Sequence, residues 1–339
     1  MADAWSTAGA RPIGQRCYVG RRRMAYTDLS EHQWMIADRA RTSAYDEALR
    51  RAVGAADAVL DFGCGLGILA MFAARAGARR VYAVDRLPIV RLAQGIAKKN
   101  GLSNVDFVFA PEGPFSLPEK VDVIVSEWMG HFALHEGMLG PLCAARDLHL
   151  VAGGRMIPER VTLKAALVCQ PALYEERSFF NRMPYGLDFS SVTPWALSEL
   201  SSEAIGAEDL LWPAATMATL DLATIAGAPG FVEGEVRPER PGTVYGIAGW
   251  FEAEMGHGIR LDTGPLAPPT HWKQLFFPFA EPWSVDPARP VKLRMTPVQL
   301  DEVHTRWQWW AGDGASERGG DNLMLLAYLR RPLSAGMLR

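Results

Sequence analysis

Two kinds of hydrophobic pattern divide the chain. Between residues 58 and 158, short apolar runs alternate with longer segments of helical spacing. The runs at 58–62, 80–85, 105–109 and 121–126 are typical of strands covered on both faces, and helices are expected at 67–76, 88–100 and 134–148. Strands that alternate with helices predict an α/β domain built on a parallel, doubly wound sheet.

A helical spacing also precedes this domain. Within residues 29–53, five side chains recur at steps of three and four: His32, Met35, Asp38, Arg41 and Tyr45. Residues at such steps lie on one face of a helix. We therefore expect a helix over 29–53 that presents these side chains together.

After residue 158 the pattern changes to short apolar runs separated by glycine and proline turns. It predicts an antiparallel β domain, either a sandwich or a barrel. Strands are expected at 161–169, 243–255, 275–279, 291–295, 305–310 and 323–329. The stretch 174–211 is helix-compatible and rich in aromatic residues, so it is expected to be an insertion that packs on another surface. The chain thus divides into 1–57, 58–157 and 158–339.

Composition narrows the class of protein. The 339 residues carry a net charge of −3, which gives no polyanion-binding signature, so nucleic acid is not an expected partner. The sequence shows neither a secretory signal nor an apolar run of membrane-spanning length, which predicts a cytoplasmic protein without a membrane partner. Cys17, Cys64, Cys143 and Cys169 are widely spaced, so no metal site is expected.

A glycine-rich loop follows the first predicted strand. The segment 59–67 reads VLDFGCGLG, with Gly63, Gly65 and Gly67 leading into a helix, and Asp85 ends the next strand. Glycines let the backbone approach a ligand closely, while an acidic side chain at that strand end can accept the hydroxyls of a ribose. The spacing is shorter than in pyrophosphate-binding loops. It favours S-adenosylmethionine, and a dinucleotide is the alternative.

Two glutamates follow the fourth predicted strand. Glu127 stands at its carboxyl end, where parallel sheets bind ligands, and Glu136 comes nine residues later. Two carboxylates converging there would form a clamp for a planar cation. Spacing alone leaves another interpretation open. Both glutamates could be surface residues, with Glu136 placed near a helix start only because the helix dipole favours a negative charge there.

At these positions the sequence resembles the protein arginine methyltransferases. The SEWMG segment with its second glutamate is similar to the double-glutamate motif of that family, and 59–67 is similar to its cofactor motif. The pattern HxxMxxDxxRTxxY at 32–45 and the segment THWKQ at 270–274 match two further motifs in the same order. The resemblance covers most of the chain from Tyr26 onward.

The resemblance implies a role for each matching residue. S-adenosylmethionine would be held by His32, Met35, Arg41, Gly63, Gly65, Gly67, Asp85 and Glu112. Catalysis would fall to Glu127, Glu136, His271 and Asp38, and substrate contacts to Tyr26, Met138 and Trp272. The residues alone are also compatible with ordinary core packing of His271, Met35, Met138 and Trp272.

The resemblance also implies architecture and partners. The α/β part would be a Rossmann-like class I methyltransferase domain, with residues 1–57 over the cofactor. The β domain would be a barrel, and 174–211 a helical dimerisation arm, so a homodimer is expected. Two departures stand out: Arg22 and Arg23 replace aromatic residues of the family's N-terminal lid, and His131 replaces the aromatic residue after SEWMG.

The expected reaction is transfer of a methyl group to a guanidino nitrogen of arginine. Arginine stays protonated in proteins, so two carboxylates that grip its other N–H groups would make the remaining nitrogen a better nucleophile. Free L-arginine and arginine in a protein both remain open as substrates; the excess of arginine over lysine and the compact chain suggest a bacterial member acting on free arginine. Alternatives are methylation of another small cationic metabolite, or an inactive scaffold of the same fold.

Overall fold

A five-stranded parallel sheet forms the centre of the first domain. The computed structural model describes residues 28–111, 113–300 and 305–322. The order of the strands in the sheet is β3-β2-β1-β4-β5, and all neighbours are parallel. The strands are β1 (Ala58–Phe62), β2 (Arg80–Asp85), β3 (Val105–Phe109), β4 (Val121–Val125) and β5 (Leu150–Ile157). This confirms the predicted α/β sheet, to which β5 is an unpredicted addition.

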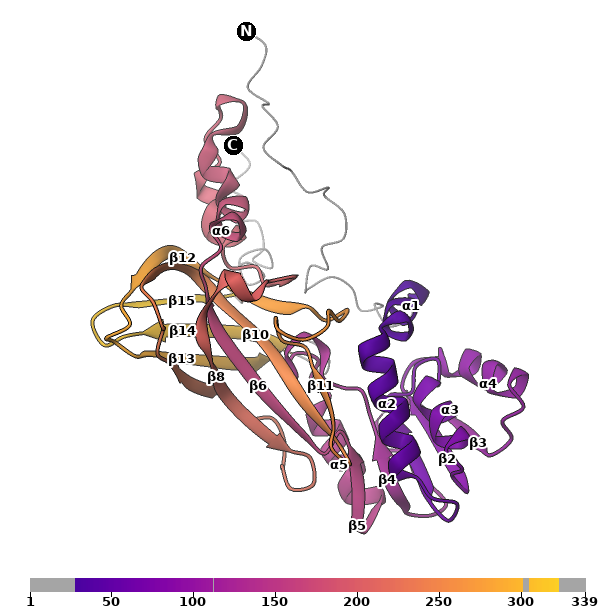
Figure 1. The fold of residues 1–339 in the computed structure, drawn as a ribbon. Helices are drawn as coiled ribbons and strands as arrows, with labels where there is room; N and C mark the ends of the chain where they lie inside the picture. The colour runs from indigo at the N-terminus through magenta and orange to yellow at the C-terminus, as the bar shows by residue number, and fades with distance from the viewer. Residues whose placement is uncertain (1–27, 112, 301–304, 323–339) are drawn as a thin grey trace.

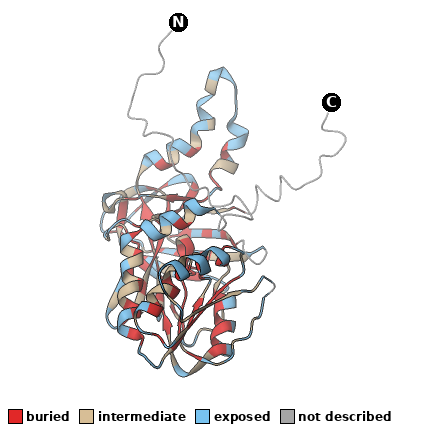
Figure 2. Cartoon of the chain, turned by 90° about the vertical axis from the view of Figure 1, so that its right-hand side faces the viewer, coloured by how far each residue is buried: buried red, intermediate tan, exposed pale blue. Residues whose placement is uncertain are grey.

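Three helices connect these strands. They are α3 (Ile68–Arg75), α4 (Val90–Lys99) and α5 (Leu139–His149). Helix α3 begins directly after Gly67, whose left-handed backbone (φ 79°) makes the turn out of the glycine loop. Helix α5 begins later than the pattern predicts, because residues 133–138 form a loop. The central strands are buried on both faces, as Figure 2 shows by their red colour.

The predicted helix over 29–53 is in fact two helices, α1 (Leu29–Ala37) and α2 (Arg39–Ala52). The break falls at Asp38, whose backbone is extended and whose Oδ1 accepts a hydrogen bond from the Arg41 amide at 3.0 Å. Aspartate stabilises a helix start better than a helix interior. The expectation of one continuous helix is therefore wrong at this residue.

The second domain consists of two antiparallel sheets. One has the order β7-β12-β10-β6-β8 with β11 beside β10, and the other has the order β15-β14-β13-β9. The strands are β6 (Arg160–Val168), β7 (Ser201–Glu203), β8 (Leu210–Asp221), β9 (Val232–Val236), β10 (Gly242–Gly256), β11 (Ile259–Asp262), β12 (Gln274–Val285), β13 (Val291–Gln299), β14 (Thr305–Gly312) and β15 (Glu317–Asp321). The strand expected at 323–329 lies outside the described residues.

The two sheets face one another across a shared apolar core. Alternate residues of β13, such as Val291, Leu293 and Met295, are buried, while those between them are exposed or half-buried. Strand β8 runs beside β9, and β12 beside β15, so the sheets approach each other at both edges. Among the described strands the hydrogen-bonded ladder does not close, so the expected barrel is an open one.

A helical arm leaves the β domain between β6 and β7 and projects from the body of the molecule (Figure 1). It contains α6 (Pro171–Arg177), three short 3₁₀ turns and α7 (Thr193–Ala196). Arg177 fixes its base: the buried guanidinium pairs with Glu203 at 3.1 Å and lies 4.8 Å from the ring centre of Phe276. The helical part is shorter than the predicted 174–211, because residues 201–203 and 210–211 already belong to the sheet.

Within the part of the chain that the structure describes, no helix is both long and apolar enough to cross a membrane.

Candidate active site

The glycine loop and Asp85 meet at the carboxyl edge of the parallel sheet. Gly63, Gly65 and Gly67 all have positive φ angles, between 53° and 79°. The Asp85 carboxylate accepts the amide of Gly65 at 2.7 Å and the amide of Leu87 at 2.7 Å. A carboxylate has further lone pairs, so Asp85 can still accept hydroxyl groups in this position.

The missing side chains of the loop glycines make room for two expected site residues. A Cβ on Gly65 would lie 2.8 Å from Cε1 of His32, and one on Gly63 would lie 3.3 Å from the terminal methyl of Met138. His32 from α1 and Met138 from the loop before α5 therefore both lie against the glycine loop. Segments far apart in the sequence converge on the same backbone.

Arg41 links α1 to the carboxyl edge of the sheet. Its Nη1 donates to the Met35 carbonyl at 3.2 Å, which satisfies an open carbonyl at the end of α1. Its Nη2 donates to Oε2 of Glu127 at 3.2 Å, and both side chains are largely buried. The side chain of Met35 itself is half-buried.

Asp38 and His271 form a pair across the two domains. Oδ2 of Asp38 accepts both the backbone amide and Nδ1 of His271, each at 2.8 Å. Because a carboxylate cannot donate, Nδ1 carries the proton and Nε2 is left with its lone pair in the neutral ring. Burial raises the pKa of Asp38, but hydrogen bonds from His271 and from the Arg41 amide outweigh it, so the pKa lies below its usual value.

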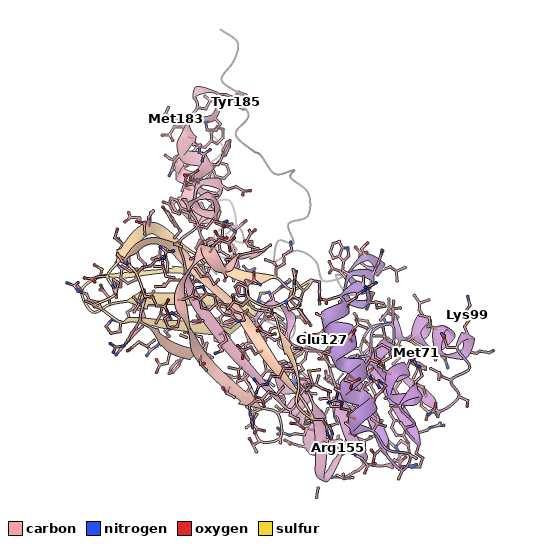
Figure 3. The ribbon with its side chains drawn as sticks, viewed as in Figure 1. Met71, Lys99, Glu127, Arg155, Met183 and Tyr185 are labelled. Carbon is pink, nitrogen blue, oxygen red and sulfur yellow. The ribbon has the colours of Figure 1, made fainter. Side chains whose placement is uncertain are left out.

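Glu127 follows β4 and is held from two sides. Its Oε1 accepts the Met129 amide at 3.2 Å, and its Oε2 meets Arg41. The residue before it, Ser126, accepts the hydroxyl of the buried Tyr45 on α2 through its carbonyl at 3.1 Å. Figure 3 shows Glu127 where the two domains meet.

Glu136 folds back over the same loop. A Cβ on Gly130 would lie 2.7 Å from Oε1 of Glu136, so this carboxylate lies against the backbone of Gly130, which has a φ of 49°. Glu127 accepts the amide of Met129, the residue directly before Gly130. Both carboxylates thus border the same short stretch of backbone.

Sequence reasoning missed the residues that anchor this loop in the β domain. Phe132 is fully buried and packs on Phe277 and Trp307, with ring centres 5.7 and 5.3 Å apart. Gly249 in β10 makes room for it, since a Cβ there would lie 2.8 Å from the Phe132 ring. His135 Nδ1 accepts the indole N–H of Trp307 at 3.1 Å. The one available signal was the run of apolar residues from Phe132 to Leu134 within the loop.

His131, the departure noted after SEWMG, is tied to the THW segment. Its Nδ1 lies 2.8 Å from the carbonyl of Trp272 and 3.2 Å from the hydroxyl of Ser202. Since a carbonyl only accepts, Nδ1 carries the proton. Burial lowers the pKa of His131, and the nearby His271 and Lys273 lower it further.

Trp272 lies in the core rather than on an open wall. Its side chain is 2% exposed, with the ring of Phe251 at 5.1 Å and that of His271 at 4.2 Å. The Trp272 ring therefore packs against the His271 ring and supports it. Two further expected site residues, Tyr26 and Glu112, lie outside the described residues.

Two buried polar atoms near the glycine loop have no hydrogen-bond partner among the described residues. They are Nε of Arg41 and Oδ1 of Asp61, whose other oxygen accepts the Ala70 amide. A donor left open on Arg41 suits a carboxylate, and an acceptor left open on Asp61 suits an ammonium group. With Asp85 at the strand end, this donor and acceptor set fits the amino-acid and ribose parts of S-adenosylmethionine.

The fold and the site together define a class: a Rossmann-like methyltransferase domain joined to an antiparallel β domain. Comparison with known families agrees. The model described as the arginine methyltransferase oligomerization subdomain matches residues 159–306, and that of ribosomal protein L11 methyltransferase matches residues 41–133.

Similar proteins identify the family of the chain more narrowly. It is 32% identical over 332 residues to the probable protein arginine N-methyltransferase 6 of Arabidopsis thaliana, covering 82% of this chain and 75% of that protein. It is 34% identical over 265 residues to protein arginine N-methyltransferase 1 of Schizosaccharomyces pombe, covering 75% and 77%. The chain belongs to the protein arginine N-methyltransferase family.

Solved structures agree with this placement. The Trypanosoma brucei PRMT1 enzyme–prozyme heterotetrameric complex with AdoHcy superposes with a TM-score of 0.78 at 28% identity, covering 87% of this chain and 98% of that one. A structure of PRMT6 with SAH shares the fold, with a TM-score of 0.62. The expected family, enzyme class and cofactor, S-adenosylmethionine, are thereby confirmed.

Proposed function

We propose that this enzyme methylates a guanidino nitrogen of arginine residues in proteins. The observation that carries the proposal is the position of two carboxylates, Glu127 and Glu136, against the backbone of Met129 and Gly130. A planar cation with several N–H groups is the ligand that two such acids suit best. Glu127 and Glu136 would each accept N–H groups of the substrate.

The two acids also offset the repulsion between the cationic substrate and the cationic cofactor. When bound, S-adenosylmethionine supplies an electrophilic methyl group on a cationic sulfur. Two unit charges about 4 Å apart repel by roughly 4 kcal/mol at an effective dielectric of 20. The negative charges of Glu127 and Glu136 offset this repulsion, and they draw the substrate's positive charge toward the nitrogens they grip.

Cofactor and substrate sites would share Arg41. Its open Nε and its position over the sheet edge suit the carboxylate of the cofactor. His32, Gly63, Gly65 and Gly67 would border the methionine part, and Asp85 would hold the ribose. Met35 and Met138 would then lie beside the accepting nitrogen.

His271 and Asp38 would remove the proton that the methylated nitrogen loses. The hydrogen bond from Nδ1 to Asp38 leaves Nε2 of His271 as the acceptor atom, and the carboxylate stabilises the charged ring that forms. The His271 side chain keeps 19% exposure, which provides a path to solvent. Trp272 holds the ring in place.

The relatives support protein arginine over free arginine, because those reported above are protein arginine N-methyltransferases. Mass spectrometry of reactions with labelled cofactor can test this directly. An Arg-Gly-rich peptide and free L-arginine would be offered side by side, and label is expected on the peptide. Label on free arginine alone would contradict the proposed substrate.

We further propose that two chains pair through the helical arm. The arm exposes large apolar side chains, including Met183 at 54%, Tyr185 at 91% and Leu187 at 60%. Monomeric proteins rarely expose so many apolar groups together. The family model that matches residues 159–306, described as an oligomerization subdomain, supports the same conclusion.

The clamp is tested by Glu136→Gln. The neutral amide keeps the shape but removes one negative charge, so turnover is expected to fall at least roughly 100-fold. S-adenosylmethionine affinity, measured by calorimetry, is expected to stay within about two-fold of the parent. Glu235→Gln on the outside of the β domain is the matched control and should be fully active. Near-normal turnover of Glu136→Gln would refute the clamp.

A further inference from the structure

A cavity of about 520 Å³ opens beside the Asp38–His271 pair. It lies between α1, the start of α2 and the loop that precedes β12. Trp34 and the prolines at 268 and 269 form apolar walls, and Asp38 and His271 belong to the lining. Because the proposed proton acceptor borders it, the cavity adjoins the place where the arginine side chain would enter.

Two cations, Arg39 and Lys273, line this cavity. Arg39 and Lys273 have no side-chain hydrogen bond or ion pair among the described residues. Two unpaired cations facing one cavity create a positive potential there.

Asp38 is the one acidic residue among the described residues that line the cavity, so it offsets only one of the two positive charges. Its oxygens accept hydrogen bonds from the Arg41 amide and from His271. Ser202, the remaining polar side chain of the lining, donates to the Trp272 carbonyl at 2.6 Å. Glu31 is close enough to interact with His271 but does not line the cavity. An incoming anion would therefore meet Arg39 and Lys273.

Lys273 is placed close to the loop of the two glutamates. Its backbone is left-handed, with a φ of 55°, and it directly follows Trp272 of the THW segment. After burial, the charges of His271 and Lys273 both lower the pKa of His131, which stands on that loop. The ammonium group therefore lies within electrostatic reach of the segment that carries Glu127 and Glu136.

We propose that this cavity binds an acidic side chain of the protein substrate, aspartate or glutamate, near in sequence to the methylated arginine. The carboxylate pairs with Arg39 and Lys273, and the aliphatic part of the peptide packs on Trp34 and the prolines. This inference rests on the proposed function. Arg39 is exposed and Lys273 half-buried, so the preference is modest, about five-fold over an uncharged peptide.

The test uses peptides with one arginine that differ at a single position. Glutamate or glutamine is placed in turn at each of the three residues before and after the arginine. Both kcat/KM and the peptide affinity of the enzyme with S-adenosylhomocysteine are measured. At one or two positions the glutamate peptide is expected to be preferred about five-fold, and 0.5 M salt should reduce this preference because it screens exposed charges.

Variants assign the preference to the cavity. In Arg39→Gln/Lys273→Gln the ratio between glutamate and glutamine peptides is expected to fall to about one. Lys99→Gln is the matched control: Lys99 is an exposed cation on α4, far from Glu127 in Figure 3, and the ratio should persist. If the double variant unfolds early in a thermal scan, the two single variants replace it.

The outcomes separate this inference from the function on which it rests. Equal values for glutamate and glutamine peptides at every position would overturn the inference and leave arginine methylation intact. A preference that survives in folded variants would overturn it as well. Absence of turnover on every peptide would contradict the proposed function, while the affinity measurements would still decide the role of the cavity.

Discussion

Asp38 joins three parts of the molecule. Its backbone amide donates to the Trp34 carbonyl at the end of α1, while its carboxylate accepts the Arg41 amide at the start of α2 and holds His271 of the β domain. Arg41 acts similarly, between the end of α1 and Glu127. The site residues are therefore structural supports for one another, and a substitution at one of them is expected to disturb its neighbours.

Asp61 offers a pH-dependent test at this scale. Burial raises its pKa to about 7, against the hydrogen bond from Ala70 that lowers it. The folded state therefore prefers the protonated acid. The stabilisation that Asp61 contributes is complete below pH 4 and is lost as the pH rises through 7. From pH 6 to 8 the wild type should lose about 1.4 kcal/mol of unfolding free energy through this group.

The comparison variant is Asp61→Asn, which keeps an acceptor for Ala70 but does not titrate. Denaturant unfolding at pH 6 and pH 8, without cofactor, measures both proteins. The variant should lack the extra loss between these values. Parallel pH profiles for the two proteins would show that Asp61 does not titrate in this window.

At the scale of elements, the loop from β4 to α5 depends on both domains. Motif spacing predicted that Gly63, Asp85 and Glu127 lie at the carboxyl ends of parallel strands, because the end of such a strand fixes where the next residues go. It could not predict the contact of Phe132 with Gly249, since that depends on packing between segments more than 100 residues apart. Nor could it show that Asp38 divides the first helix, because helical spacing continues through the break.

Gly249→Ala tests the anchor of this loop. The new methyl group would meet the Phe132 ring, and overpacking of this kind typically costs about 1–3 kcal/mol. Displacing Phe132 also moves the loop of Glu136, so kcat is expected to fall with stability. Denaturant unfolding and steady-state kinetics measure the two effects.

Gly140→Ala is the matched control, because nothing lies within 4 Å of the Cβ it would add at the start of α5. It should be fully active and slightly more stable, since alanine favours a helix over glycine. Adding Phe132→Leu to Gly249→Ala should recover part of the lost stability. No change in Gly249→Ala would mean that the loop is not fixed by this contact.

At the scale of the whole molecule, the arm projects beyond the two domains and makes the outline elongated (Figure 1). Composition and aromatic content predicted that residues 174–211 pack on another surface. They did not predict where the arm ends or that Arg177 and Glu203 anchor it, because that ion pair spans 26 residues and depends on how β7 pairs with β12.

Met183→Glu/Leu187→Glu tests pairing through the arm. Two charges at the apolar tip should shift the protein from dimer to monomer in light scattering at micromolar concentration, because burying them would cost more than the contact gains. Leu148→Glu on α5 is the control, with the same type of substitution at a residue 54% exposed outside the arm. A wild-type protein that is already monomeric would contradict the proposed pairing.

The insertion of Phe132 between β-domain side chains has a consequence for protein engineering. The two acids of the proposed clamp belong in sequence to the α/β domain, yet Phe132, which lies between them in the chain, packs on Phe277 and Trp307 of the β domain. A chimaera that exchanges only one of the two domains between relatives would keep the sequence motifs but lose the contacts of Phe132 that position them. Such an exchange should give an active enzyme only when residues 126–138 and the β-domain residues around Gly249 come from the same parent.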